Sequence, residues 1–230
     1  MLSDIFSSFD EQNGNLVFFL LVWFFSFFML FLFFNFFWIG FSRFISFFFL
    51  LVDYVLSQAS SSLGGLLRGF SFFISFLFLF LIIINFFGLS PYIFSASSHL
   101  VVTFSLGFIV WMSLLFSSFF WNVGVFFSHF LPVGAPFLLN PFLVLVETVS
   151  IMVRPITLSV RLAANMGAGH IVIGLIGSYL MGSMLSLGVV SSVFLFLVNS
   201  FYFVFEFGIC IIQAYIFSLL LVLYSDEHSL

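Results

Sequence analysis

The chain contains no lysine, and its only basic residues are four arginines among 230 residues. A protein that binds nucleic acid needs a basic patch or stripe on its surface. Four arginines cannot form one, so nucleic acid is excluded as a partner. The positive-inside rule, which reads membrane orientation from Lys and Arg in loops, also has almost nothing to count. The charge pattern therefore leaves the orientation in a membrane open.

Charged residues of both signs are scarce: they make up 5% of the chain, whereas hydrophobic residues make up 64%. Soluble domains carry roughly a quarter of charged residues. The composition therefore predicts an integral membrane protein whose main surroundings are the lipid bilayer.

Cysteine and paired histidines are also lacking. Cys210 is the only cysteine, so no internal disulfide can form, and its apolar neighbours predict an inert buried thiol. The four histidines, at positions 99, 129, 170 and 228, are widely scattered, so we expect no metal or haem site. No phosphate-binding glycine motif and no serine or cysteine triad signature is present. We therefore expect no cofactor, no nucleotide site and no enzymatic activity of the chain by itself.

Phenylalanine is abundant, with 44 residues, far more than packing requires. Such a bias is typical of a thymine-rich coding strand in some organelle genomes. The first 15 residues carry three acidic side chains and no arginine, unlike a basic transit peptide or the start of a signal peptide. Together these features predict a protein that is encoded and made inside the organelle that uses it.

Apolar stretches of about 20 residues can cross a hydrocarbon core of about 30 Å. We expect such spans at residues 16–34, 70–87 and 100–121. The stretch 36–52 is interrupted by Arg43 and ends at Asp53, so we expect it to be interfacial or re-entrant. Residues 57–69 are small and polar and predict a connection. Residues 122–141 contain three prolines and two glycines and are suited to lying at the interface.

The C-terminal part of the chain has longer apolar runs. Residues 142–177 have no clear break except Pro155, and residues 187–224 have none. Continuous helices of these lengths would measure about 54 and 57 Å, nearly twice the hydrocarbon thickness. Each run is either two shorter helices or one strongly tilted helix. Because no polar turn divides either run, we favour two long tilted helices that form a hairpin, with its turn within residues 178–192.

The fold class expected is therefore an all-α integral membrane protein with several transmembrane helices and a C-terminal hairpin of two long, strongly tilted helices. We expect one membrane domain, 1–230. Its parts are a polar N-terminus (1–15), transmembrane and interfacial helices (16–141), the long hairpin (142–224) and a polar tail (225–230).

The few charges inside the long helices are regularly spaced. Glu147, Arg154 and Arg161 are seven residues apart, which at 100° per residue brings them within about 20° of one helix face. On the second helix, a second polar stripe is formed by Tyr202, Glu206, Cys210 and Gln213. Two polar stripes can face each other or line an aqueous path.

Two readings of these charges remain open. The arginines can hold the helices together by pairing with Glu147 or Glu206, because intramembrane charges often pair with one another. Alternatively, they are functional, because a mid-membrane charge costs roughly 3 kcal/mol on the insertion scale. For Arg154, near a helix end, snorkelling or pairing with Glu147 is as plausible as a functional role. His170 is either a hydrogen-bonded core residue or, because histidine titrates near neutral pH, a proton relay.

Several segments resemble a known family. The chain reads HFLPVGAPFLLNPFLVLVETVS, then RPITLSVRLAANMGAGH, and later EFGICIIQAYIFSLLLVLY, with NFFGLSPY upstream. These segments are similar to subunit a of F-type ATP synthases in its mitochondrial form, the stator's proton channel. The resemblance covers most of the chain from Asn85 onward, whereas residues 36–70 do not align clearly.

The resemblance implies roles for the residues of the stripes. It implies that Arg161 is the essential arginine that faces the proton-carrying carboxylates of the c-subunit ring. It places Glu147 in a half-channel open to the matrix, and Glu206 and His170 in one open to the intermembrane space. The remaining members of the site are Asn165 and Gln213, as polar neighbours of the arginine, and Arg154, whose position varies in the family.

The implied function is proton translocation that couples flow through two offset half-channels to rotation and ATP synthesis. The implied partners are the c-subunit ring, the peripheral stalk, other membrane subunits and the lipid bilayer, and the implied location is the mitochondrial inner membrane, crossed several times. The alternative is an antiporter-like or structural membrane subunit of a respiratory complex. Antiporter-like subunits rely on intramembrane lysines, which this chain lacks.

Overall fold

The computed structural model describes residues 23–24, 43–90, 95–128, 130, 139–185 and 188–226. Within these residues the regular secondary structure is helical, without a β-strand. Four of the described helices are long and apolar enough to cross a membrane. They are α3 (Phe70–Leu89), α4 (Leu100–Trp121), α6 (Asn140–Leu185) and α7 (Val189–Asp226). The prediction of an all-α membrane protein is confirmed for this part of the chain.

The expected spans at 70–87 and 100–121 correspond to α3 and α4. A helix forms there because a backbone in lipid must satisfy its own hydrogen bonds. Serines inside these helices are also satisfied locally: Ser75 donates to the carbonyl of Phe72 at 2.9 Å, and Ser113 donates to that of Val110 at 2.7 Å. The expected span at 16–34 lies outside the described residues, apart from the helical pair Trp23 and Phe24.

The region expected to be interfacial contains α2 (Arg43–Ser61), which is not among the four candidate spans. The predicted connection at 57–69 is wrong for its first part, since α2 continues to Ser61. The hydroxyls of Ser57, Ser60 and Ser61 donate to carbonyls three residues earlier, so these serines do not interrupt the helix. A short 3₁₀ helix, η2 (Leu63–Leu66), follows.

The two C-terminal runs are single helices of 46 and 38 residues, α6 and α7. The alternative of two shorter helices in each run is therefore wrong. Pro155 lies inside α6 without ending it. The break between α6 and α7 lies within the predicted range 178–192 and is short, because helix continues to Leu185 and resumes at Val189. Serine hydroxyls again donate to carbonyls three residues earlier, as Ser178 does to Leu175 at 2.8 Å.

The proline-rich region before α6 contains one short helix, α5 (Val123–Ser128). The helix α6 begins at Asn140, two residues before the expected start, and includes Pro141 in its first turn. Proline is tolerated there because the first amides of a helix have no intrahelical partner. Before α4 lies another short 3₁₀ helix, η3 (Ala96–Ser98).

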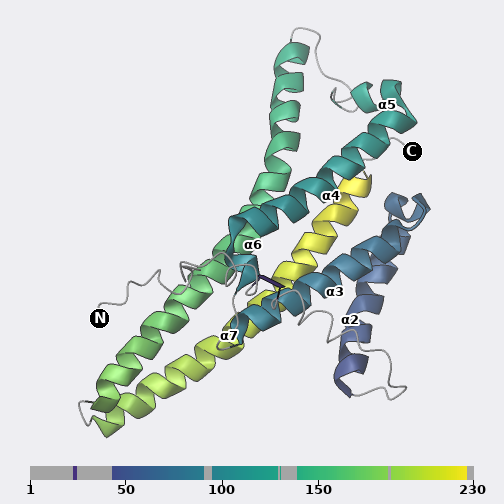
Figure 1. Ribbon diagram of the computed structural model, residues 1–230. Coiled ribbons are helices and arrows are strands. Elements are labelled where there is room, and N and C mark those ends of the chain that lie inside the picture. Colours follow the sequence, from purple (N-terminus) through teal and green to yellow (C-terminus); the bar gives the residue numbers. More distant parts are fainter. Residues whose placement is uncertain are drawn as a thin grey trace. The chain divides into compact units, whose positions relative to one another are not determined.

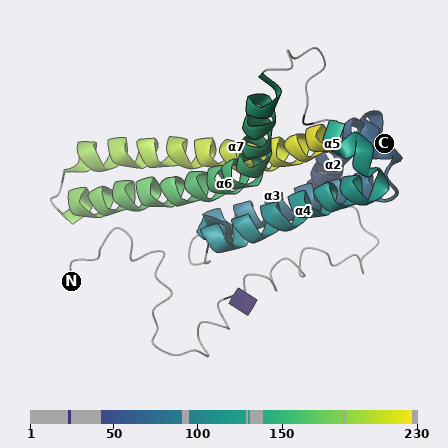
Figure 2. The same cartoon turned by 90° about the horizontal axis from the view of Figure 1, so that it is seen from above.

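The chain divides into two compact units. The first contains the described residues of Phe80–His99 and Leu162–Ala214. In it, the C-terminal part of α6 and the N-terminal part of α7 run side by side as a hairpin (Figures 1 and 2). Leu89, Met166 and Cys210 form a buried cluster there, from α3, α6 and α7. The burial predicted for Cys210 is confirmed.

The second unit contains the described residues of Phe41–Leu79, Leu100–Arg161 and Tyr215–Leu230. Polar contacts join α2 and the segment after it to the C-terminal end of α7. The Gln58 amide donates to the Tyr215 hydroxyl at 3.0 Å, and the backbone N–H of Leu63 donates to Asp226 Oδ1 at 2.8 Å. These contacts anchor a segment that the family resemblance left unaligned.

Candidate functional site

Glu206 is a buried acid on a membrane helix. Its side chain on α7 is only 3% exposed, and its Oε2 atom has no hydrogen-bond partner among the described residues. Burying an ionised carboxylate without partners is costly. An ionisable group kept in such a place in a membrane protein marks a functional site by default.

The carboxylate of Glu206 lies directly against the backbone of α6 at Gly169. A Cβ atom built on Gly169 would lie 2.6 Å from Oε2, 2.7 Å from Cδ and 2.8 Å from Oε1 of Glu206. Real Cβ atoms essentially never approach so closely. Glycine is therefore the residue that leaves room for this carboxylate. The sequence analysis did not single out Gly169, because the partner that requires a glycine there lies on another helix.

Two further polar side chains surround Glu206. Tyr202 lies one turn earlier on α7, within range of the charge on Glu206. His170, next to Gly169 on α6, also lies within range of that charge and near the backbone of Gly88 on α3. The structure thus places Glu206 and His170 close together. The two other predicted residues of this unit, Asn165 and Gln213, are each half-buried, on α6 and α7.

Asn85 on α3 is a buried polar residue of the same unit that the sequence analysis gave no role. Its side chain is 1% exposed, and neither polar atom of its amide has a hydrogen-bond partner among the described residues. Its backbone carbonyl lies 4.0 Å from the Cys210 sulfur on α7. An unsatisfied buried amide is rare in native proteins and indicates a site where water or another polar group is expected. The signal in the sequence was an asparagine inside an otherwise apolar span.

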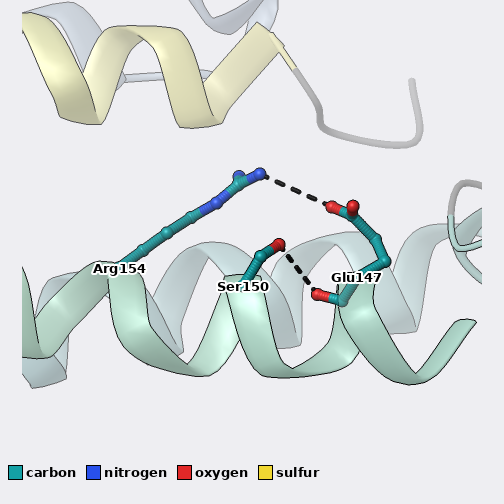
Figure 3. A network of polar contacts seen from close by, with 3 residues as sticks. All are labelled: Glu147, Ser150 and Arg154. Atoms are coloured by element: carbon teal, nitrogen blue, oxygen red, sulfur yellow. Dashed lines mark hydrogen bonds and ion pairs between the residues drawn. The ribbon is translucent and has the colours of Figure 1, made fainter. Parts of the chain in front are cut away.

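A second group of charges lies in the other unit, on the N-terminal part of α6. Arg154 Nη2 lies 3.6 Å from Glu147 Oε1 (Figure 3). The guanidinium also lies over the ring of Tyr224 on α7, 5.0 Å from the ring centre. The predicted pairing of Arg154 with Glu147 is therefore present in the structure. Ser150, between them, donates to the backbone carbonyl of Glu147 at 3.0 Å (Figure 3).

This ion pair borders a cavity of about 300 Å³ within the second unit. The polar residues in its wall are Ser118 on α4, Glu147 and Arg154 on α6, and Tyr224 on α7. The remaining wall residues are apolar or aromatic: Trp111, Leu114, Leu115, Phe126, Phe130 and Ile151. Sequence reasoning missed the contributions of α4 and α7, because the pattern of one helix does not reveal what packs against it.

Arg161 is exposed on α6. Among the described residues of its own unit it forms no ion pair, in contrast to Arg154. Arginine stays protonated at any ordinary pH, so this position presents a permanent positive charge on the surface of a membrane helix.

Comparison with known protein families identifies the chain. Residues 15–226 match the family described as ATP synthase A chain. The ATP synthase subunit a of Locusta migratoria is 36% identical over 231 residues, which covers 99% of each chain. That of Drosophila melanogaster is 35% identical over 229 residues, again 99% of each chain. That of Albinaria caerulea is 45% identical over 144 residues, or 63% of this chain and 66% of the relative. The chain therefore belongs to the ATP synthase A chain family, whose members include these a subunits.

Proposed function

We propose that the chain is the proton-translocating stator subunit of a rotary F-type ATP synthase in the mitochondrial inner membrane. Family membership and four helices able to cross a membrane support this role. The proposed partners are the c-subunit ring, the peripheral stalk and the neighbouring membrane subunits. In this role the chain conducts protons, and ATP is made elsewhere in the complex.

The observation that carries the proposal is the position of Arg161 between two groups of ionisable residues. Along the continuous helix α6, Glu147 and Arg161 are separated by about 21 Å, and Arg161 and His170 by about 14 Å, at 1.5 Å per residue. One group joins Glu147 with Arg154 beside a cavity, and the other joins His170 with the buried Glu206. Two half-channels that end on either side of a fixed charge need such an arrangement.

The proposed mechanism follows from charge. A proton that enters past Glu206 and His170 neutralises a rotor carboxylate, which then turns through lipid at little cost. After nearly a full turn the carboxylate meets Arg161, whose permanent charge favours the ionised form. The released proton leaves past Glu147. Asn165 lies one turn after Arg161 on α6, and the family resemblance implies that Gln213 is a second polar neighbour of the arginine. Arg161 also obstructs a direct leak between the half-channels.

The driving force requires several protons for each ATP. One elementary charge that falls through 100 mV yields about 2.3 kcal/mol. Coupling therefore depends on every proton passing by way of the rotor, and a leak past Arg161 would lose this energy.

Replacing Arg161 by alanine tests the proposal. In assembled synthase in membrane vesicles, Arg161→Ala should abolish proton-driven ATP synthesis and leave the amount of assembled complex largely unchanged. Val160→Ala is the matched control, because Val160 is the preceding residue of α6, is also exposed and is uncharged. Normal coupling in Arg161→Ala would contradict the proposal.

Purification separates the proposal from the respiratory-complex alternative. The tagged chain should copurify with a ring of c subunits and an ATPase head. Copurification with a respiratory complex instead would favour the alternative.

A further inference from the structure

We infer that Arg154 is a specificity-determining residue: its positive charge excludes metal cations such as Na⁺ from the cavity at Glu147, while protons still reach the carboxylate. The inference rests on the proposed function, in which Glu147 lies on the exit path for protons. It gives a role to the arginine for which the family resemblance offered none.

The first observation is the geometry of the ion pair. The 3.6 Å between Arg154 Nη2 and Glu147 Oε1 is longer than a hydrogen bond between these groups. The guanidinium therefore acts on the carboxylate through its charge and leaves the carboxylate oxygens open to other donors. The Glu147 side chain is 39% exposed, so water can reach it. Arg154 thus neutralises Glu147 electrostatically without occupying the oxygens that would accept a proton.

The second observation is the fixed position of the guanidinium. It lies over the ring of Tyr224, 5.0 Å from the ring centre, within the range of a cation–π contact. Its side chain is only 23% exposed. Held by a carboxylate on α6 and an aromatic ring on α7, the charge stays at the wall of the cavity. A basic side chain without these two contacts would not keep its charge at this position.

The third observation is the chemistry of the cavity wall. Among the residues that line the cavity, Glu147, Ser118 and Tyr224 have oxygen-bearing side chains. Carboxylate and hydroxyl oxygens are ligands that hard cations accept. Among the described residues of the wall, Glu147 and Arg154 alone carry charge. Without Arg154, the cavity would present one uncompensated carboxylate with two neutral oxygen donors, which is a suitable site for a monovalent cation.

With Arg154 in place, a metal ion beside Glu147 would lie within a few ångströms of a like charge. The same charge repels a proton, but a proton forms a covalent O–H bond with a carboxylate oxygen and can move along water and hydroxyl groups, whereas Na⁺ is held only by weak coordination. The repulsion therefore removes Na⁺ from the cavity first. Discrimination between Na⁺ and protons at this cavity therefore depends on the charge of Arg154.

The test uses the assembled synthase in sealed vesicles with Na⁺ as the probe. ATP-driven proton uptake is measured with a pH-sensitive dye as Na⁺ replaces N-methyl-D-glucamine at constant ionic strength. Each variant is compared with its own rate without Na⁺, so a slower basal rate does not affect the comparison. Arg154→Gln should be inhibited by Na⁺ at a concentration at least about tenfold lower than any that inhibits the unaltered synthase, because the repelling charge nearby is gone.

Two variants separate charge from structure. Arg154→Lys keeps the charge and should resemble the unaltered protein in its response to Na⁺. The double variant Arg154→Gln, Glu147→Gln removes the carboxylate as well and should lose the inhibition. Persistent inhibition in the double variant would place the Na⁺ site elsewhere and overturn the inference.

If proton uptake by Arg154→Gln is slowed equally at every Na⁺ concentration, the inference is also overturned, since Arg154 would then have only a structural role. If Arg154→Gln does not assemble, Tyr224→Leu releases the guanidinium while keeping both charges. It should then show a smaller but measurable inhibition by Na⁺, and its absence would count against the inference. Lack of proton uptake by the unaltered synthase would contradict the proposed function instead.

Discussion

The contact between Gly169 and Glu206 predicts a large functional effect of adding one methyl group. In Gly169→Ala the new Cβ would lie 2.6 to 2.8 Å from the carboxylate atoms of Glu206, whereas ordinary contact begins at 3.4 Å. The carboxylate would have to retreat by roughly 0.6 to 0.8 Å. Misplacing a reacting group by about 1 Å can slow a reaction about 100-fold. We therefore expect proton-driven ATP synthesis to fall by about 10- to 100-fold.

The same substitution should have little effect on folding. The atoms in the way belong to the end of a flexible side chain, which can rotate, and alanine favours a helix over glycine by about 1 kcal/mol. Gly167→Ala is the matched control. It adds the same methyl group to the same helix two residues earlier, where a Cβ would meet nothing within 4 Å. Both variants should assemble, and only Gly169→Ala should lose proton transport, measured as the rate of dye quenching in vesicles.

A second substitution should restore part of the loss. Shortening the acid in Gly169→Ala, Glu206→Asp withdraws the carboxylate from the added methyl group by about one methylene, and the rate should rise above that of Gly169→Ala alone. Equal rates for Gly169→Ala and Gly167→Ala would refute the reasoning, because the close approach would then have no influence on proton transfer.

Two further predictions concern the contacts between the segment after α2 and the end of α7. In Gly64→Ala the new Cβ would overlap the side chain of Ser225, and overpacking of this kind costs about 1 to 3 kcal/mol; the thermal unfolding temperature of the purified complex should fall, and an unchanged value would contradict the contact. Tyr215→Phe removes the hydroxyl that hydrogen-bonds to Gln58 at 3.0 Å, which should destabilise this contact by about 0.5 to 1.5 kcal/mol. Hydrogen exchange of the α2 amides should increase in this variant while proton transport continues, and unchanged exchange would refute the role of the bond.

The helices were predictable where composition alone decides them. The spans α3 and α4 are mostly apolar, so their ends appear in the sequence as Gly, Pro and polar clusters. The hairpin turn could be placed only within the range 178–192, because Ser178 and its neighbours resemble turn residues. In the structure, their hydroxyls hydrogen-bond to carbonyls of the same helix. The sequence does not tell whether a serine hydroxyl will bond within a helix or end it.

The candidate site was predictable only within one helix at a time. The spacing of Glu147 and Arg154 predicts one face, and the structure shows their ion pair. Contacts between helices leave no such pattern in the amino-acid sequence. The approach of Glu206 to Gly169 and the position of Tyr224 under Arg154 depend on how two helices pack. Periodicity describes a helix surface but does not identify which neighbour covers it.

The cluster of Leu89, Met166 and Cys210 has an electrical consequence. Cys210 follows Glu206 by one turn on α7, and the Cys210 sulfur lies 3.7 Å from the Met166 sulfur on α6. The thiol and thioether side chains of this cluster do not provide the chain of hydroxyls and water along which a proton hops. In the proposed mechanism, this cluster closes the inner end of the entry path to protons. Protons therefore cannot pass through the stator alone and must be carried by the moving rotor.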